Sequence, residues 1–395
     1  MSTRLVAIDA TRGIALLGMI AVHSLYESTA NGSPTWTFAV FGGRAAAGFA
    51  VLAGVGIAFM TGRARVKRCD ALPTASMLAV RALAVTAIGL ALGYADASFG
   101  AVILPYYGVM FLLAVPLVFL PTPVVAALGA AIAVGMPALS HVWLAHLPVA
   151  NLDNPTVSDL VHQPLTLLTE LSVNGEYPAL PWMAYLCAGI VVGRLSLRSV
   201  KVAAAMLTAG VTMAVGSSVV SSLLLTRFGG LTHIWTAMPG SILTSAETAE
   251  MLALGGDGTV PVSTWWWLAV DAPHTSTPVD LIGTTGTAIG VLGLLLLLGH
   301  LTGKWARRVL TAVLSPLAAA GSMTLTLYVA HIVFINSDYD QYDATTGYLL
   351  QLVAALLIGL AWRATAGRGP LEALVTALAT RAKRLATRAP SPAAA

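Results

Sequence analysis

The feature that most constrains this chain is a series of apolar segments, each near the roughly 20 residues that a helix needs to cross a bilayer. Ten are predicted, near residues 5–26, 36–62, 73–94, 99–120, 122–140, 178–195, 202–226, 278–302, 314–336 and 345–363. Composition agrees, because only 10% of the residues are charged, against about 25% in a typical soluble domain. The sequence therefore predicts an all-α integral membrane protein, a polytopic bundle of about ten transmembrane helices.

Longer polar segments and a basic end complete the predicted organisation. Residues 141–177 and 227–277 contain Pro, Trp, His and acidic residues and are expected to form two outer loops. Residues 369–388 alternate apolar and basic residues at helical spacing, which predicts an amphipathic helix on the membrane surface. We therefore expect a membrane domain over 1–376, followed by a basic tail over 377–395 that is amphipathic and then disordered.

The cations predict the orientation of the bundle. With ten spans, 17 of the 21 Lys and Arg residues, Arg4 among them, fall on one side of the membrane. By the positive-inside rule that side is the cytoplasm, so both termini are predicted to be cytoplasmic in a multi-pass protein of the cell membrane, most simply a bacterial plasma membrane. The basic belt then faces anionic lipid, and no nucleic-acid partner is expected.

Three arginines, Arg12, Arg44 and Arg81, fall inside predicted spans. A charge at that depth costs at least about 2.5 kcal/mol on insertion scales, so it normally faces protein or a water-filled cavity. At about 1.5 Å per residue, Arg12 and Arg81 lie in the inner half of the bilayer and Arg44 lies in the outer half. The inner arginines are suited to hold a cytosolic coenzyme by its phosphates.

The first span, AIDATRGIALLGMIAVHS, combines a cation with a protonatable group. Arg12 and His23 are eleven positions apart, which places them on one helix face about 16 Å apart along the axis. Asp9 precedes Arg12 by three residues and can pair with it on that face. The inner end of this face can bind negative charge, and the outer end can move a proton.

The same residues carry a resemblance to known families. The Arg–ten residues–His spacing of RGIALLGMIAVH resembles the opening of the acyltransferase-3 family of membrane O-acyltransferases. The wider segment AIDATRGIALLGMI looks even more like the heparan-α-glucosaminide N-acetyltransferase-like family and its bacterial relatives, in the same transmembrane acyltransferase superfamily. Further similar segments follow in the same order, namely LPYYGVMFLLAVPL (104–117), YPALPWMAYLCAGIVVGRL (177–195), AAAGSMTLTLYVAHIVF (318–334) and GRGPLEALV (367–375).

The resemblance implies transfer of an acyl group, most simply acetyl, from cytosolic acetyl-CoA or another acyl-CoA to a glycan or glycolipid hydroxyl or amine at the outer face. His23 would be the catalytic base or carry the acyl group, and Arg44 would stabilise an oxyanion. Arg12, with Asp9 and Arg81, would bind the donor. In the animal acetyltransferases the catalytic histidine lies in the loop after the first span. The corresponding LYESTANGSPTW has none, so the acyltransferase-3 assignment of His23 is preferred.

Four further residues are predicted to bind the acceptor at the outer end: His331, Glu176, Tyr177 and Trp182. Plainer interpretations stay open for several residues, since Asp9 with Arg12 can be a structural pair, Arg81 can snorkel and His331 can simply pack. No metal site is expected, because the eight histidines are scattered without a ligand spacing. Membrane lipid and the acceptor are the expected partners, and a homodimer stays open.

Two other classes of function compete with the acyltransferase. A transporter or flippase for a glycan or lipid intermediate would use the same charged cavity. Such proteins often contain inverted repeats and broken helices, for which this chain offers only Pro105 and Pro116 in one span. A non-catalytic membrane protein would leave the cost of Arg12 and Arg44 unexplained.

Overall fold

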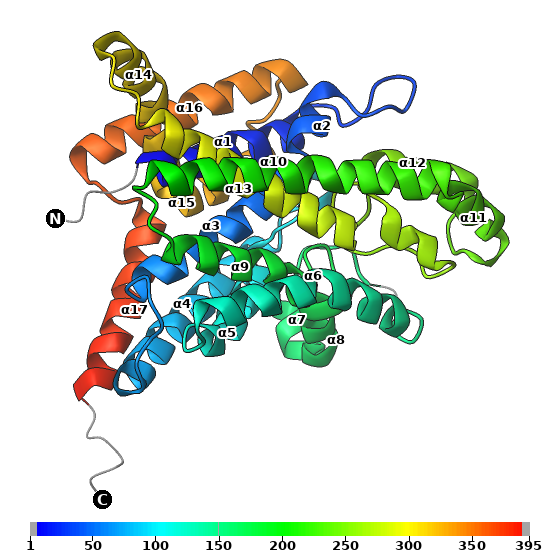
Figure 1. Ribbon diagram of the computed structural model, residues 1–395, viewed down its shortest axis with the longest axis horizontal. Coiled ribbons are helices and arrows are strands. Elements are labelled where there is room, and N and C mark those ends of the chain that lie inside the picture. The colour runs from blue at the N-terminus through cyan, green and yellow to red at the C-terminus, as the bar shows by residue number, and fades with distance from the viewer. Residues whose placement is uncertain (1–5, 149, 389–395) are drawn as a thin grey trace, which may run out of the picture.

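The computed structural model describes residues 6–148 and 150–388, and Arg4 and the predicted disordered end over 389–395 lie outside these ranges. The described residues form helices, turns and loops and contain no β-strand. One isolated β-bridge joins Ser28 and Pro34. Figure 1 shows that most of the long helices run side by side along one direction, which is the arrangement expected of a membrane bundle. An all-α polytopic fold is thereby confirmed.

Eight helical stretches in the described part of the chain are long and apolar enough to cross a membrane. They are α1 (Val6–Ser24), α2 with α3 (Trp36–Phe41 and Arg44–Met60), α4 (Ala71–Leu92), α6 (Thr122–Leu144), α10 (Val200–Ser222), α13 (Pro278–Leu298), α14 with α15 (Lys304–Ala320 and Thr324–Ile335) and α16 (Ala344–Thr365). Two shorter apolar helices, α5 (Leu104–Leu117) and α9 (Ala179–Arg194), occupy the remaining predicted positions. Every predicted span thus contains a helix, while the number that cross the bilayer stays a prediction.

The helix α5 is short, and the segment just before it lies inside the bundle without being helical. Its 14 residues cover about 21 Å, less than the hydrocarbon thickness of a bilayer. The residues just before it lie outside a helix and need other partners for their backbone N–H groups, because unsatisfied groups are costly away from water. Val102 N–H donates to Asn154 Oδ1 at 2.7 Å, and Ile103 N–H donates to the Tyr328 hydroxyl at 3.2 Å.

Glycines allow two pairs of helices to approach closely. In α3 and α9, Gly54 and Gly189 face each other, and a methyl group on either would overlap the backbone of the other helix. Gly210 of α10 and Gly286 of α13 are related in the same way. Since apolar side chains gain little from leaving lipid, such backbone contact is the usual source of helix association in a membrane.

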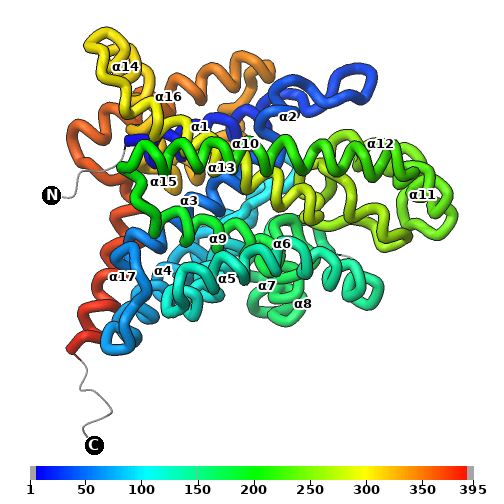
Figure 2. The backbone as a smooth tube through the Cα atoms, in the orientation of Figure 1, coloured from blue at the N-terminus to red at the C-terminus, as the bar shows by residue number. Residues whose placement is uncertain are grey.

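The two ends of the bundle differ in their coverage (Figures 1 and 2). At the end that carries the N-terminus of α1, helix α17 (Pro370–Arg388) runs across the bundle and packs against α4. Of the helices in the predicted outer loops, α11 (Gly230–Thr236) and α12 (Ser245–Leu254) lie at the opposite end, whereas α7 (Val157–His162) and α8 (Pro164–Thr169) lie below α6 in Figure 1.

Helix α17 extends unbroken across the domain boundary predicted at residue 376, so that boundary falls inside a helix. Its apolar face is held by the bundle, with Val375 and Ala379 buried and the Glu372 carboxylate accepting hydrogen bonds from Leu325 N–H (2.7 Å) and the Thr326 hydroxyl (2.6 Å). The predicted amphipathic helix is therefore present, but it packs on the transmembrane helices instead of forming a separate tail.

A small apolar core organises the outer loops. It consists of Ile234, Val260, Trp267, Val270 and Ala272. Because this core ends at Ala272, it anchors the start of the short segment 273–277, which enters the bundle just before α13.

Candidate active site

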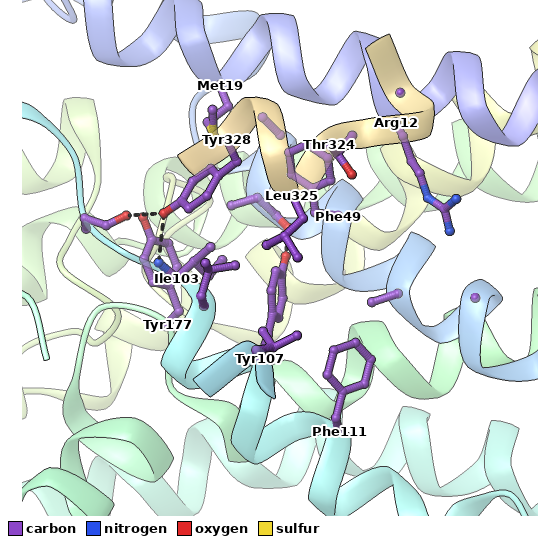
Figure 3. A pocket seen from close by; sticks show the side chains of 18 of the residues that line it. Arg12, Met19, Phe49, Ile103, Tyr107, Phe111, Tyr177, Thr324, Leu325 and Tyr328 are labelled. Carbon is purple, nitrogen blue, oxygen red and sulfur yellow. Dashed lines mark hydrogen bonds between the residues drawn. The ribbon is translucent and has the colours of Figure 1, made fainter. Parts of the chain in front are cut away.

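A cavity of about 240 Å³ runs through the middle of the bundle. Its walls come from α1, α3, α4, α5 and α15 together with the segment 273–277. Figure 3 shows Arg12 at one end and Tyr177 at the other, with Phe49, Tyr107 and Leu325 between them. The cavity therefore joins two chemically different regions, which we call the basic end and the imidazole end.

The basic end is built from Arg12 of α1, Arg81 of α4 and Glu372 of α17. The Arg12 guanidinium lies 3.4 Å from Asp9 Oδ1 and donates to the Leu52 carbonyl at 3.4 Å. Both distances are long for charge-assisted hydrogen bonds.

Arg81 is less well satisfied than Arg12. Its guanidinium lies over the Phe111 ring, 5.8 Å from the centroid, and its Nε is buried without an acceptor in the part of the chain that the structure describes. A buried donor without a partner costs about 1–3 kcal/mol. An anion that binds at the basic end would therefore meet a donor that is already desolvated and still lacks an acceptor in the described residues.

The imidazole end contains a chain of hydrogen bonds that starts at His23. His23 Nδ1 lies 3.0 Å from His331 Nε2, and His331 Nδ1 lies 2.5 Å from Gln351 Oε1. Gln351 Nε2 donates in turn to the Ser24 hydroxyl at 3.3 Å. The two imidazoles are nearly parallel, with an interplanar angle of 12°.

The donor–acceptor direction of these hydrogen bonds determines which nitrogen of His23 carries its proton. Gln351 accepts through its amide oxygen, so His331 Nδ1 carries the proton and His331 Nε2 is an acceptor. His23 must then donate through Nδ1, which leaves His23 Nε2 with a free lone pair. His23 lines the cavity, so an unprotonated nitrogen is available there, as a general base requires.

The His23 ring is also held from the opposite side. A Cβ added at Gly100 would lie 3.0 Å from His23 Nδ1 and Cε1, so only glycine leaves enough room for the ring. The extended segment before α5 thus presses its backbone against the imidazole. Together with His331, Gly100 restricts the ring to one orientation.

A second imidazole, that of His274, lines the same end of the cavity. It comes from the segment 273–277 and lies against Trp182 and Tyr177, at centroid distances of 6.4 and 5.3 Å. Burial lowers the pKa of His274 to about 4, so this side chain is neutral at pH 7. Gly43, with φ +65°, makes room where α2 and α3 are broken, because a Cβ there would lie 3.1 Å from Pro273 Cα.

The first half of the chain matches a known family. A family model described as heparan-alpha-glucosaminide N-acetyltransferase, catalytic, matches residues 4–229, more than half of the sequence. The chain belongs to this family. Membership indicates a membrane acetyltransferase, in agreement with the helical bundle. No individually curated protein matches the chain.

The matched residues 4–229 contain only part of the acetyltransferase site. Arg12, His23 and Arg81 lie inside the match. The other imidazoles, His274 and His331, lie beyond it. The imidazole end is therefore assembled from both halves of the chain.

The predicted acceptor-binding residues of the acetyltransferase are distributed around the imidazole end. Tyr177 lines the cavity, whereas Trp182 is buried behind His274 and donates from Nε1 to the Ser276 hydroxyl at 3.3 Å. His331 is 4% exposed and is not among the residues that line the cavity, and its Nε2 contacts His23 Nδ1. Glu176 is also outside the cavity wall.

Glu176 belongs to a group of carboxylates above the imidazole end. Burial and the nearby Asp257 and Glu27 raise the pKa of Glu176 to about 8. Burial likewise raises the pKa of Glu27 and that of Asp257, with a further contribution from Glu250 in both cases. These carboxylates, which we call the acidic mouth, therefore favour their protonated forms more than isolated carboxylates do.

Arg44, predicted to be catalytic, is not among the residues that line the cavity. Its guanidinium donates to the Ala39 carbonyl at 2.8 Å. It also lies near the buried carboxylate of Asp280, to which it is electrostatically attracted. Arg44 begins α3, and its side chain turns back toward the α2–α3 break.

His274 is the site residue that sequence patterns missed. It lies in a loop that was expected to face the outside, and it belongs to no motif that resembles the family. One signal was present, since APHTSTP is a polar, proline-bounded stretch directly before a span. Nothing in that stretch indicates that it enters the bundle, because this depends on Gly43 and on the core around Trp267.

Proposed function

We propose that this protein transfers an acetyl group from cytosolic acetyl-CoA, or another acyl group from acyl-CoA, to a hydroxyl or amine of a glycan or glycolipid at the outer face of the membrane. One observation carries the proposal: a single cavity contains both Arg12 and His23, which are separated by about 16 Å along α1. A donor held at the basic end then has its reactive carbonyl near the imidazole end.

The size of the cavity supports a partly inserted donor. Its volume of about 240 Å³ is below the roughly 300–1,000 Å³ typical of sites that enclose a drug-sized ligand. The slender acyl-bearing arm of the coenzyme would enter, with its phosphates at the basic end and its adenosine outside the cavity. Arg12 and the unsatisfied Nε of Arg81 would bind its phosphates.

The hydrogen-bond chain supports base catalysis by His23. Its free Nε2 would take the proton of the acceptor hydroxyl or amine as the acceptor attacks the thioester carbonyl carbon. The carbon–sulfur bond then breaks, and the imidazolium returns the proton to the departing thiolate. His331 and Gln351 would act as positioning residues that keep the proton of His23 on Nδ1.

The proposed orientation follows the cations and the family. Both termini and α17 would face the cytoplasm of a bacterial cell, beside anionic lipid. A sugar acceptor is proposed because the family is described by a glucosaminide substrate. The acidic mouth around Glu176 would lie at the outer face, where a sugar amine or hydroxyl arrives.

The proposal is tested with purified protein in sealed vesicles. Radiolabelled acetyl-CoA is supplied on one side and a panel of glycans and glycolipids on the other. We expect CoA release on the donor side and label on the acceptor side, both lost in His23→Gln. Unlabelled acceptors together with passage of a glycan or lipid across the vesicle would assign the cavity to transport instead.

A further inference from the structure

The cavity contains a second imidazole that base catalysis by His23 does not use. His274 approaches from the outer loops, whereas His23 approaches from α1, and the two lie close enough to interact electrostatically. Both therefore border the place where, under the proposed function, the thioester carbonyl reacts.

The backbone around His274 is held in an unusual conformation. Its φ of +55° lies in the left-handed region, which is unfavourable for a non-glycine residue. Gly256 N–H donates to the Pro273 carbonyl at 3.0 Å, and Gly258 N–H donates to the His274 carbonyl at 2.7 Å. These bonds maintain the strained turn, which directs the ring into the cavity wall.

The surroundings of the ring decide which nitrogen carries its proton. Nδ1 is buried without a hydrogen-bond partner in the described part of the chain. A buried N–H without an acceptor is rarer and more costly than an unused lone pair. The neutral ring therefore carries its proton on Nε2, and that N–H is the one available to a ligand.

The ring also lacks the group that a general base needs. The rings packed against it are Tyr177 and Trp182. No carboxylate or other acceptor in the described residues bonds its Nδ1, so nothing would stabilise an imidazolium there. His23, in contrast, has His331 and Gln351 behind it.

We infer that His274 is a catalytic residue that donates from Nε2–H to the thioester carbonyl oxygen as this oxygen becomes negative. The acceptor forms its bond to the carbonyl carbon and gives its proton to His23, and the carbonyl electron pair moves onto the oxygen that His274 stabilises. When the carbon–sulfur bond breaks, the pair returns to the carbonyl and the thiolate receives the proton from His23. His274 keeps its own proton throughout. This inference rests on the proposed function.

Three variants separate a donor from other roles of His274. His274→Gly removes the ring and tolerates the positive φ, and loss of one oxyanion donor is expected to lower kcat by about 10²–10³-fold. His274→Gln restores an N–H and should recover at least tenfold over His274→Gly. The matched control is His233→Gln, since His233 also stacks on a tryptophan, Trp266, but lies outside the cavity.

Binding of donor analogues provides a readout that damage to the fold would not imitate. A ketone analogue of acetyl-CoA that forms a hydrated, tetrahedral adduct should bind wild type at least tenfold more tightly than His274→Gly. A thioether analogue without the carbonyl should bind both with equal affinity. The acid limb of the pH–rate profile should keep its midpoint in His274→Gln.

Failure of the inference and of the proposed function give different results. If wild type forms no acetylated acceptor, the proposed function fails. If wild type is active and His274→Gly retains its kcat within threefold, only the donor role fails. Loss of the acid limb in His274→Gln would assign His274 as the base and would also overturn the inference, as would weaker binding of the thioether analogue to His274→Gly.

Discussion

The basic end and the imidazole end of the cavity differ in how far their polar groups are already hydrogen-bonded. At the basic end, the buried Nε of Arg81 has no acceptor among the residues that the structure describes, and the Arg12 guanidinium lies 3.4 Å from both Asp9 Oδ1 and the Leu52 carbonyl. At the imidazole end, His23 is bonded into a chain that continues to Gln351. The basic end keeps a buried donor for an anion, whereas the hydrogen bonds of the imidazole end are already formed. The first arrangement suits binding of a charged ligand, and the second suits transfer of a proton.

The ends also differ in how the chain builds them. The arginines of the basic end, Arg12 and Arg81, both lie within the family match over 4–229, whereas the imidazole end needs His274 and His331 from the second half. Donor binding and chemistry should therefore respond separately to substitution. The predictions below test that separation.

The largest effect is expected for His23→Gln. The amide can still donate to His331, but it cannot accept a proton at the position of Nε2, so kcat should fall by about 10²–10⁴-fold. The KM for acetyl-CoA should change less than threefold, because the basic end is intact. Steady-state kinetics with His146→Gln, an exposed histidine, as control would check this, and kcat within threefold of wild type would remove His23 from the mechanism.

Arg81→Gln should show the opposite pattern. A lost hydrogen bond to a phosphate is worth about 1.5–3 kcal/mol, so the KM for acetyl-CoA should rise by about 10- to 100-fold while kcat at saturation stays within threefold. Arg44→Gln is the matched control, since that arginine lies outside the cavity. Equal KM values in wild type and Arg81→Gln would contradict donor binding at the basic end.

Gln351→Leu tests whether the order of the imidazole end matters. It removes the acceptor of His331 Nδ1, and with it the bias that keeps the His23 proton on Nδ1. The expected loss in kcat is about tenfold, equivalent to one hydrogen bond of roughly 1.4 kcal/mol. Gln351→Glu keeps the acceptor oxygen and should retain most of the rate, whereas Gln341→Leu in an exposed loop serves as the control. A similar loss in Gln351→Glu would show that only packing is involved.

The smallest effect concerns the acidic mouth above the imidazole end. Glu176 has a pKa of about 8 in the folded protein, against 4.5 as its ordinary value, so the folded state binds more protons between these pH values. Stability should therefore fall as pH rises through this window, and Glu176→Gln should remove that part of the decrease. We expect the Tm difference between pH 5 and pH 8.5 to be at least about 2 °C smaller in the variant.

Thermal unfolding in detergent measures this difference. Asp153→Asn replaces an exposed carboxylate of the same loop region and should leave the wild-type pH dependence unchanged. Parallel pH curves for wild type and Glu176→Gln would show that Glu176 is ionised in the folded protein.

Sequence patterns predicted the elements far better than the contacts between them. The ten apolar segments, the helix at the basic end and the shared face of Arg12 and His23 were all found where expected. For Arg44 the sequence indicated the depth in a span but not the direction of the side chain. At the α2–α3 break its side chain bonds to the Ala39 carbonyl one turn away.

By itself, the sequence determined which segments are helical and which side chains share a helix face, since apolar periodicity and a fixed rise per residue act over short distances. Only the tertiary structure decided that His331, 308 positions away, supports His23. Only it decided that the turn carrying His274 enters the bundle beside Gly43. Such contacts depend on close packing between segments that are distant in the sequence. One glycine or one strained turn can determine which side chains come into contact, and no local sequence pattern predicts this.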